Sequence, residues 1–305
     1  MAVHDARVGP ETPPEVVAGG VGTAIRFYLL AFVWSWAVWG TAIVWPSLED
    51  WEPLIIIGGA YGPLLAAVAV AKRAGGAMNW IRHVIGLRRR VRWVLIGSVA
   101  LPLVIALVHV AAYRTFIGSV TLSSDPPWYW AVAAAPVNVW LVFWLGSALE
   151  EFGWQGVAVP ALMKRFHPLV AAALHGVVWG TWHLPLFLVD SWTGGDQSIA
   201  VLYGITITLS PIMTWLTRSA AGGVMPAVFF HAAGNHYTTL FTDETTLFDP
   251  SLLQRFDAIK LSLYLVTALV VVVATRGRLR SNPAMNRQEA GHSGQVGRYG
   301  MSSGM

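Results

Sequence analysis

The chain has 305 residues, of which 55% are hydrophobic and only 12% are charged. Soluble domains carry about 25% charged residues, so this composition excludes an ordinary soluble protein and indicates a single polytopic membrane domain. The absence of cysteine excludes disulfides, thiolate nucleophiles and cysteine-based metal sites. The net charge of +4 does not indicate a nucleic-acid partner, because the basic residues lie in loops beside apolar segments.

The first residues are polar and rich in proline and glycine, without the apolar run of a signal peptide. We therefore expect a flexible tail over 1–22, an integral membrane domain over 23–278 and a disordered, low-complexity tail over 279–305. A membrane helix needs about 20 apolar residues, and eight windows meet this requirement. They lie near 25–45, 53–71, 92–113, 129–150, 168–189, 199–217, 223–241 and 259–276. The sequence thus predicts an all-α membrane protein with about eight transmembrane helices.

The basic residues predict the orientation of these helices. With both termini in the cytoplasm, all but three of the 20 Lys and Arg fall on the cytoplasmic side; the exceptions are Arg114, Arg255 and Lys260. This asymmetry is what the positive-inside rule expects. We predict a multi-pass protein of the plasma (inner) membrane, with both termini in the cytoplasm and the lipid bilayer as its surroundings.

One stretch of the fourth window conflicts with its apolar surroundings. In "LGSALEEFGWQG", Glu150 and Glu151 follow a run without any charge. Burying an ionised carboxylate in hydrocarbon is costly, and ionisable groups inside membranes usually mark functional sites. A pair at a helix end can instead lie in headgroup water, which is the structural alternative.

Two other windows carry polar residues at helical spacing. "LHGVVWGTWHLP" holds His175 and His183, and "VMPAVFFHAAGNHY" holds His231, Asn235 and His236. Residues four apart share a helix face, so His231 and Asn235 lie together, as do Trp179 and His183. Three helices are therefore predicted to present polar faces to one intramembrane cavity. We interpret His175 and His236 as structural residues. Taken singly, His183, His231 and Asn235 could also be packing residues that bond a backbone carbonyl or a neighbouring helix.

These side chains suit the activation of water. A Glu beside a His can take a proton from water as a general base, while a second His and an Asn amide can donate to an oxyanion. The same groups, Glu150, His183 and His231, could instead bind zinc with a water in the open position. The sequence leaves both mechanisms open, so no cofactor is assigned beyond a possible Zn²⁺.

Together, "EEFGWQG", "WGTWH" and "HAAGN" resemble the three motifs of the CPBP family of intramembrane proteases, the CAAX-protease and bacteriocin-processing group. These motifs are EExxxR, FxxxH and HxxxN or HxxxD, and the resemblance covers about 130–240. It implies that Glu150 and His183 activate the water, that His231 and Asn235 form the oxyanion site, and that Glu151 is a supporting carboxylate. Two residues depart from the pattern: Gln155 stands where Arg is usual, and Trp179 stands in place of Phe.

The leading hypothesis is therefore an intramembrane endopeptidase that acts on a membrane-associated protein or peptide, of CAAX type or otherwise facing the lipid. The alternatives are a small ion- or proton-coupled transporter, and a non-catalytic immunity or scaffold protein, which the missing arginine would favour. His183 lies about 20 Å from the start of its span, which is deeper in the membrane than Glu150 is expected to lie. Glu150 reaches that depth if its helix continues past Gln155 towards Pro160, or if Pro185 and the glycines displace the fifth helix.

Overall fold

The computed structural model describes residues 19–86, 91–116, 147–189, 198–241 and 250–281, and the single positions 137, 140, 141 and 144. At 236–241 and 250–253 only the backbone is described. Every regular element in these ranges is helical, which confirms the predicted all-α class.

Six helical segments in the described ranges are long and apolar enough to cross a membrane. They are Val21–Val44, Pro46–Arg73, Val91–Phe116, Pro168–Leu188, Ile199–Ser219 and Gln254–Ala274. The span expected at 129–150 lies mostly outside the described residues, and the one expected at 223–241 corresponds to α13 (Met225–Phe241), a shorter helix of 17 residues. The chain is thus a polytopic membrane protein, while the count of eight stays a prediction.

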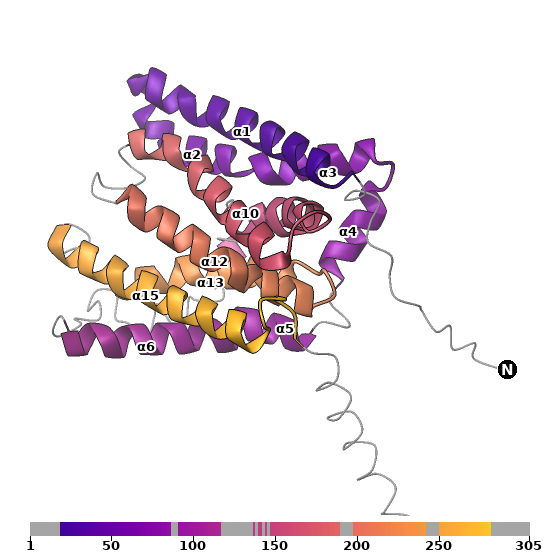
Figure 1. Cartoon of the computed structure of the whole chain (residues 1–305). Coiled ribbons are helices and arrows are strands. Elements are labelled where there is room, and N and C mark those ends of the chain that lie inside the picture. The colour runs from indigo at the N-terminus through magenta and orange to yellow at the C-terminus, as the bar shows by residue number, and fades with distance from the viewer. Residues whose placement is uncertain are drawn as a thin grey trace, which may run out of the picture.

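The helices lie roughly side by side in a bundle (Figure 1). One side is formed by α1 (Val21–Val44), η2 (Pro46–Trp51), α2 (Glu52–Ala60) and α3 (Gly62–Arg73), followed by α4 (Ala77–Ile85). The opposite side is formed by α5 (Val91–Leu95), η3 (Ile96–Ala100), α6 (Leu101–Phe116) and α15 (Pro250–Ala274). Between these sides lie α10 (Pro168–Trp182) with η6 (Leu184–Leu188), α12 (Ile199–Ser219) and α13.

Prolines set several helix boundaries. Pro53 and Pro63 occupy the first turns of α2 and α3, so the second span is built from short helices that restart at each proline. Pro168 begins α10, where the His167 side chain caps the helix by accepting from the backbone N–H of Leu169. Proline lacks a backbone N–H, which is no loss in a first turn, where that group has no partner within the helix.

A short central helix carries the acidic pair. It consists of η4 (Ser147–Leu149), α8 (Glu150–Gly153), η5 (Trp154–Ala158) and α9 (Val159–Leu162). α8 packs against α3 and α13, and η5 packs against α1, α3 and α12. The helix therefore continues past Gln155 to Leu162. This agrees with the first of the two explanations given above for how Glu150 could lie as deep in the membrane as His183.

Small residues let this central helix approach its neighbours closely. A Cβ at Gly153 would lie 2.5 Å from the carbonyl oxygen of Pro63 in α3 and 2.7 Å from the Phe27 ring in α1. Gly176 plays the same part between α10 and α12, where a Cβ would lie 2.6 Å from the Cα of Ile207. Close backbone approach at small residues is a usual way for membrane helices to associate.

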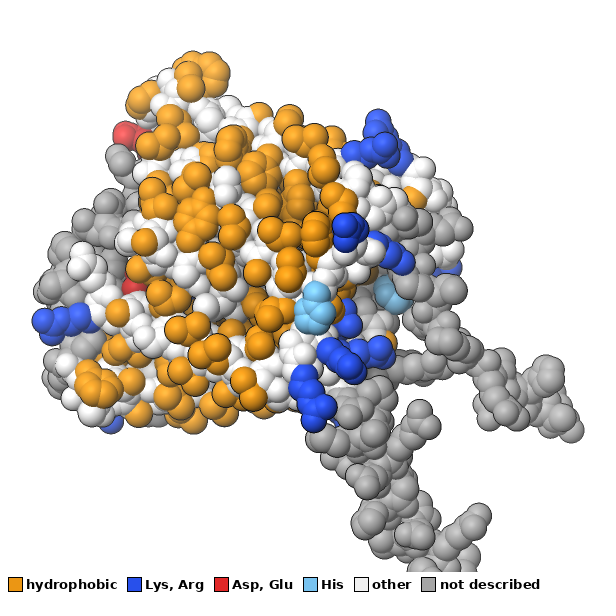
Figure 2. All heavy atoms as spheres, viewed as in Figure 1, with side chains coloured by type: hydrophobic (Ala, Val, Ile, Leu, Met, Phe, Trp, Pro, Cys, Tyr) orange, Lys and Arg blue, Asp and Glu red, His pale blue; other side chains and the backbone are white. Residues whose placement is uncertain are grey.

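Basic side chains gather towards one end of the bundle. Figure 2 shows a broad hydrophobic surface across the helices, with most of the visible Lys and Arg beyond one end of it. The last turns of α3, α4 and α12 hold Lys72, Arg73, Arg82 and Arg218. Two hydrogen bonds from backbone N–H groups attach α4 and α12 to other segments at this end: Val224 N–H donates to the carbonyl of Val84, and Ser281 N–H donates to Ser219 Oγ.

This charge distribution leads to a topology prediction. Reporter fusions at Gly76 and Gly222, beside the basic helix ends, should report a cytoplasmic location, because basic loops are retained on that side. Fusions at Gly118 and Gly195, in the expected external loops, should report the opposite side. A paired phosphatase and fluorescent-protein reporter at each position provides the measurement, and a reversed or mixed pattern would contradict the orientation.

The close approach at Gly153 leads to a stability prediction. Gly153→Ala should lower stability by about 1–3 kcal/mol, because the new methyl group must displace the Pro63 carbonyl. Thermal unfolding in detergent measures this loss. The matched control is Gly40→Ala in α1, where a Cβ would meet nothing within 4 Å. Equal melting temperatures for the two variants would show that α3 moves aside freely.

Candidate active site

The two carboxylates begin a helix that contains a π-helical turn. Glu150 is 2% exposed and Glu151 is fully buried, although both are acidic. η5 follows directly, and single π-helical turns inside helices occur frequently at functional sites. The turn is anchored by the indole of Trp80, whose N–H donates to the carbonyl of Gly156 at 3.1 Å.

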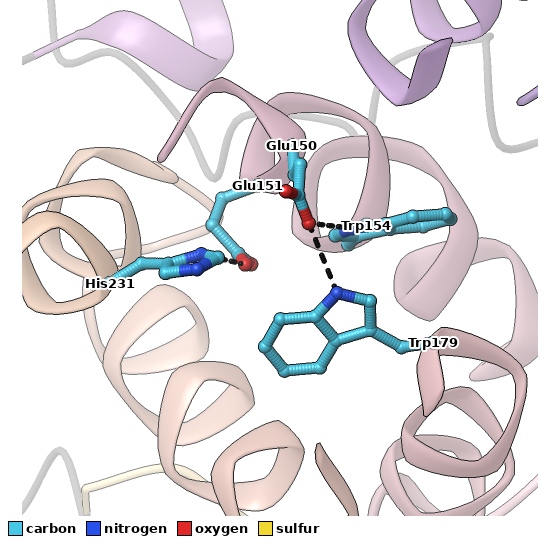
Figure 3. Close-up of polar contacts among 5 residues, drawn as sticks. All are labelled: Glu150, Glu151, Trp154, Trp179 and His231. Atoms are coloured by element: carbon cyan, nitrogen blue, oxygen red, sulfur yellow. Dashed lines mark hydrogen bonds and ion pairs between the residues drawn. The ribbon is translucent and has the colours of Figure 1, made fainter. Parts of the chain in front are cut away.

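Glu150 accepts two hydrogen bonds from indole groups (Figure 3). Its Oε2 lies 3.1 Å from Nε1 of Trp154, four residues further along the same helix, and 3.0 Å from Nε1 of Trp179 on α10. Both donors therefore bond the same oxygen. Neutral N–H donors stabilise an ionised carboxylate where water is excluded, so they offset part of the burial cost.

Glu151 pairs with an imidazole from a different helix. Its Oε1 lies 3.0 Å from Nδ1 of His231 on α13, and His231 is only 8% exposed (Figure 3). The other oxygen, Oε2, has no hydrogen-bond partner among the described residues. The acidic pair is thus held from both sides, with Glu150 facing α10 and Glu151 facing α13.

Trp179 connects three of the predicted site residues. Besides its bond to Glu150, its ring meets the His231 ring edge to face at 5.5 Å between centroids. Its backbone carbonyl lies 3.0 Å from Nδ1 of His183, so that nitrogen carries the proton and donates. His183 follows the last residue of α10 and is half-buried. Trp179 therefore contacts Glu150 and His231 through its side chain and His183 through its backbone carbonyl.

Gln155, at the position of the expected arginine, lies inside the same turn and is 1% exposed. Its Oε1 accepts from Oγ1 of Thr214 on α12 at 3.3 Å, while its Nε2 has no acceptor among the described residues. The site therefore contains a buried amide donor and a buried carboxylate acceptor, on Glu151, that no described residue satisfies.

The remaining predicted residues are His175, Asn235 and His236. His175 is buried, meets the Tyr28 hydroxyl at 3.2 Å and stacks on Trp179, which agrees with a packing role. Asn235 lies one turn beyond His231 on α13 and is exposed. The His236 side chain lies outside the described part of the chain.

The sequence analysis missed two kinds of residue. It treated Trp154 and Trp179 as flanking aromatic groups and did not identify their N–H donors. It also did not assign Lys260 and the buried Asp257, which lie one turn apart on α15, to the site. A charge within the apolar span of α15 was the available signal.

The zinc alternative was tested against the positions of the side chains. Among the described residues, no three His, Asp or Glu side chains lie close enough together to hold a metal ion. Glu150 bonds indole groups and Glu151 bonds His231, so the group expected for zinc, Glu150, His183 and His231, does not form a ligand set here.

Comparison with known proteins agrees with the motif analysis. Residues 132–237 match a family model described as Rce1-like, the type II CAAX prenyl endopeptidase Rce1-like family. The chain is also similar to the CAAX prenyl protease 2 of Methanococcus maripaludis, with 22% identity over 222 residues. The aligned part covers 67% of this chain and 80% of that protein. The matched segment includes α8, α10 and the His231 turn of α13.

Proposed function

We propose that the chain is an intramembrane protease of the CPBP family, an endopeptidase that hydrolyses a peptide bond in a membrane-associated, CAAX-type substrate. The match of residues 132–237 to the Rce1-like family model and the similarity to a CAAX prenyl protease 2 support this proposal. The observation that carries this proposal is the buried pair of Glu150 and Glu151, with His231 on one side and Trp179 on the other. The contacts among these groups favour a catalytic centre, because a proton relay in a transporter would extend along a path.

We propose that Glu150 is the general base. Its Oε2 is occupied by two indole donors, so Oε1 is the oxygen available to a water. Oε1 takes a proton from the water as the water oxygen attacks the scissile carbonyl carbon. The same proton then passes to the leaving amine nitrogen as the carbon–nitrogen bond breaks. His183, held beside Trp179, positions the water.

His231 and Asn235 are proposed to stabilise the oxyanion. With Nδ1 directed at Glu151, only Nε2 of His231 can face a substrate. An imidazole that donates from both nitrogens is an imidazolium, and the Glu151 carboxylate supplies the balancing charge. Asn235, one turn along α13, adds an amide donor. Glu151 thus acts through His231 and not on the substrate itself.

The first functional prediction separates the two carboxylates. Glu150→Gln keeps the side-chain shape but removes the base, so turnover should fall about a hundred- to ten-thousandfold. Glu151→Gln should cause a smaller loss, because the amide oxygen still accepts the bond from His231. The measurement is cleavage of fluorogenic peptides, lipidated and unlipidated, in proteoliposomes.

Expression and thermal stability of both variants serve as controls. Wild-type turnover in Glu150→Gln together with an inactive Glu151→Gln would exchange the two roles. If neither variant changes turnover while the wild type cleaves, the acidic pair is not the catalytic group.

The second functional prediction concerns the oxyanion site. Asn235→Ala should lower kcat about a hundredfold, because loss of one oxyanion donor typically removes about 3 kcal/mol of transition-state stabilisation. KM should change little, since the oxyanion exists only as the reaction proceeds. A raised KM with an unchanged kcat would instead make Asn235 a substrate-holding residue.

A further inference from the structure

We propose that Trp179 is a positioning residue that fixes the Glu150 carboxylate and takes over part of the charge stabilisation that an arginine at position 155 would supply. This inference rests on the proposed function, in which Glu150 is the base. It links the two departures from the family motif, Gln155 and Trp179, as one change in how the acidic pair is stabilised.

The contacts of Trp179 support this role. Its N–H lies 3.0 Å from Oε2 of Glu150, its ring meets His231, and its carbonyl accepts from His183. Phenylalanine, the motif residue, could keep the ring contact and the backbone carbonyl but has no N–H. The hydrogen bond to Glu150 is therefore the one contact that tryptophan adds at this position.

The surroundings of Gln155 explain why that contact matters. Two adjacent carboxylates repel each other, and the arginine of the motif would bring a positive charge to the same helix turn. Gln155 is neutral and buried, and its Nε2 meets no acceptor among the described residues. Stabilisation of the acidic pair must therefore come from elsewhere, and for Glu150 it comes from the two indole donors.

The two indoles do not act alike. Trp154 lies four residues after Glu150 on the same helix, so it follows that helix when the helix moves. Trp179 reaches Glu150 from α10, the helix that ends at His183. Only Trp179 therefore fixes the distance between the carboxylate and the helix that carries His183. Its loss should affect the chemical step more than substrate binding.

The first test compares two tryptophans of α10. Trp179→Phe removes ring volume and the bond to Glu150, and kcat should fall about ten- to a hundredfold, with little change in KM. Trp182→Phe removes the same volume, but the buried N–H of Trp182 has no acceptor among the described residues. Its loss of kcat should be clearly smaller. Equal losses would reduce Trp179 to a packing residue and overturn the proposal.

The second test is a double-mutant cycle with Gln155→Arg. If the indole supplies part of the stabilisation that the arginine charge would give, Gln155→Arg should restore part of the kcat that Trp179→Phe loses. Restoration should be incomplete, because an arginine on the helix of Glu150 cannot fix the distance to α10. Independent sites would instead give multiplicative effects on kcat. A double variant whose loss is the product of the single losses would overturn the coupling between the two positions.

A third measurement does not depend on turnover. The Trp179 indole N–H signal, identified by its absence from the spectrum of Trp179→Phe, should move upfield in ¹⁵N-labelled Glu150→Gln, because the bond to a charged acceptor is lost. An unmoved signal would overturn the positioning role. Failure of the proposed function is recognised separately, by a wild type that cleaves no peptide in the panel while this signal still moves.

Discussion

The burial of two adjacent carboxylates is the constraint on which the rest of the structure depends. An isolated ionised carboxylate in a low-dielectric interior is so costly that it is retained only with partners. Each carboxylate receives partners from a different helix: Glu150 from Trp179 on α10, and Glu151 from His231 on α13. The acidic pair can therefore remain buried only when α8, α10 and α13 are packed together, so assembly of the bundle and formation of the site are one event.

The π-helical turn after the acidic pair serves the same constraint. In a regular α-helix each residue is rotated by about 100° around the helix axis from the one before it. A π-helical turn inserts an extra residue and so rotates the following side chains to a different side of the helix. In η5 this shift coincides with Trp154, which bonds Glu150, and with Gln155, which bonds Thr214 on α12. Consecutive residues of this turn thus bond the acidic pair on the same helix and the neighbouring helix α12.

Sequence analysis could predict the acidic pair and His231, because charged and imidazole groups stand out within apolar windows. It could not predict the function of Trp179, since an indole in a chain with 16 Trp gives no sign of where its N–H points. The start of the last helix could not be predicted for a different reason. The apolar window begins at 259, but the helix begins at Pro250, because helix formation needs no apolar residues in its first turns. The proposed roles of His183 and Asn235 still rest on motif and position.

Helices α1 and α3, which pack on α8, lie outside the segment that matches the family model. Residues 132–237 match the family model, yet the face of α8 at Gly153 is covered by Pro63 and Phe27, which lie outside that segment. A fragment limited to the matched residues would expose this face to lipid and leave the acidic pair beside hydrocarbon. The matched segment alone therefore lacks part of the packing that buries α8. A chimaera that grafts it onto another membrane scaffold must carry α1 and α3 with it.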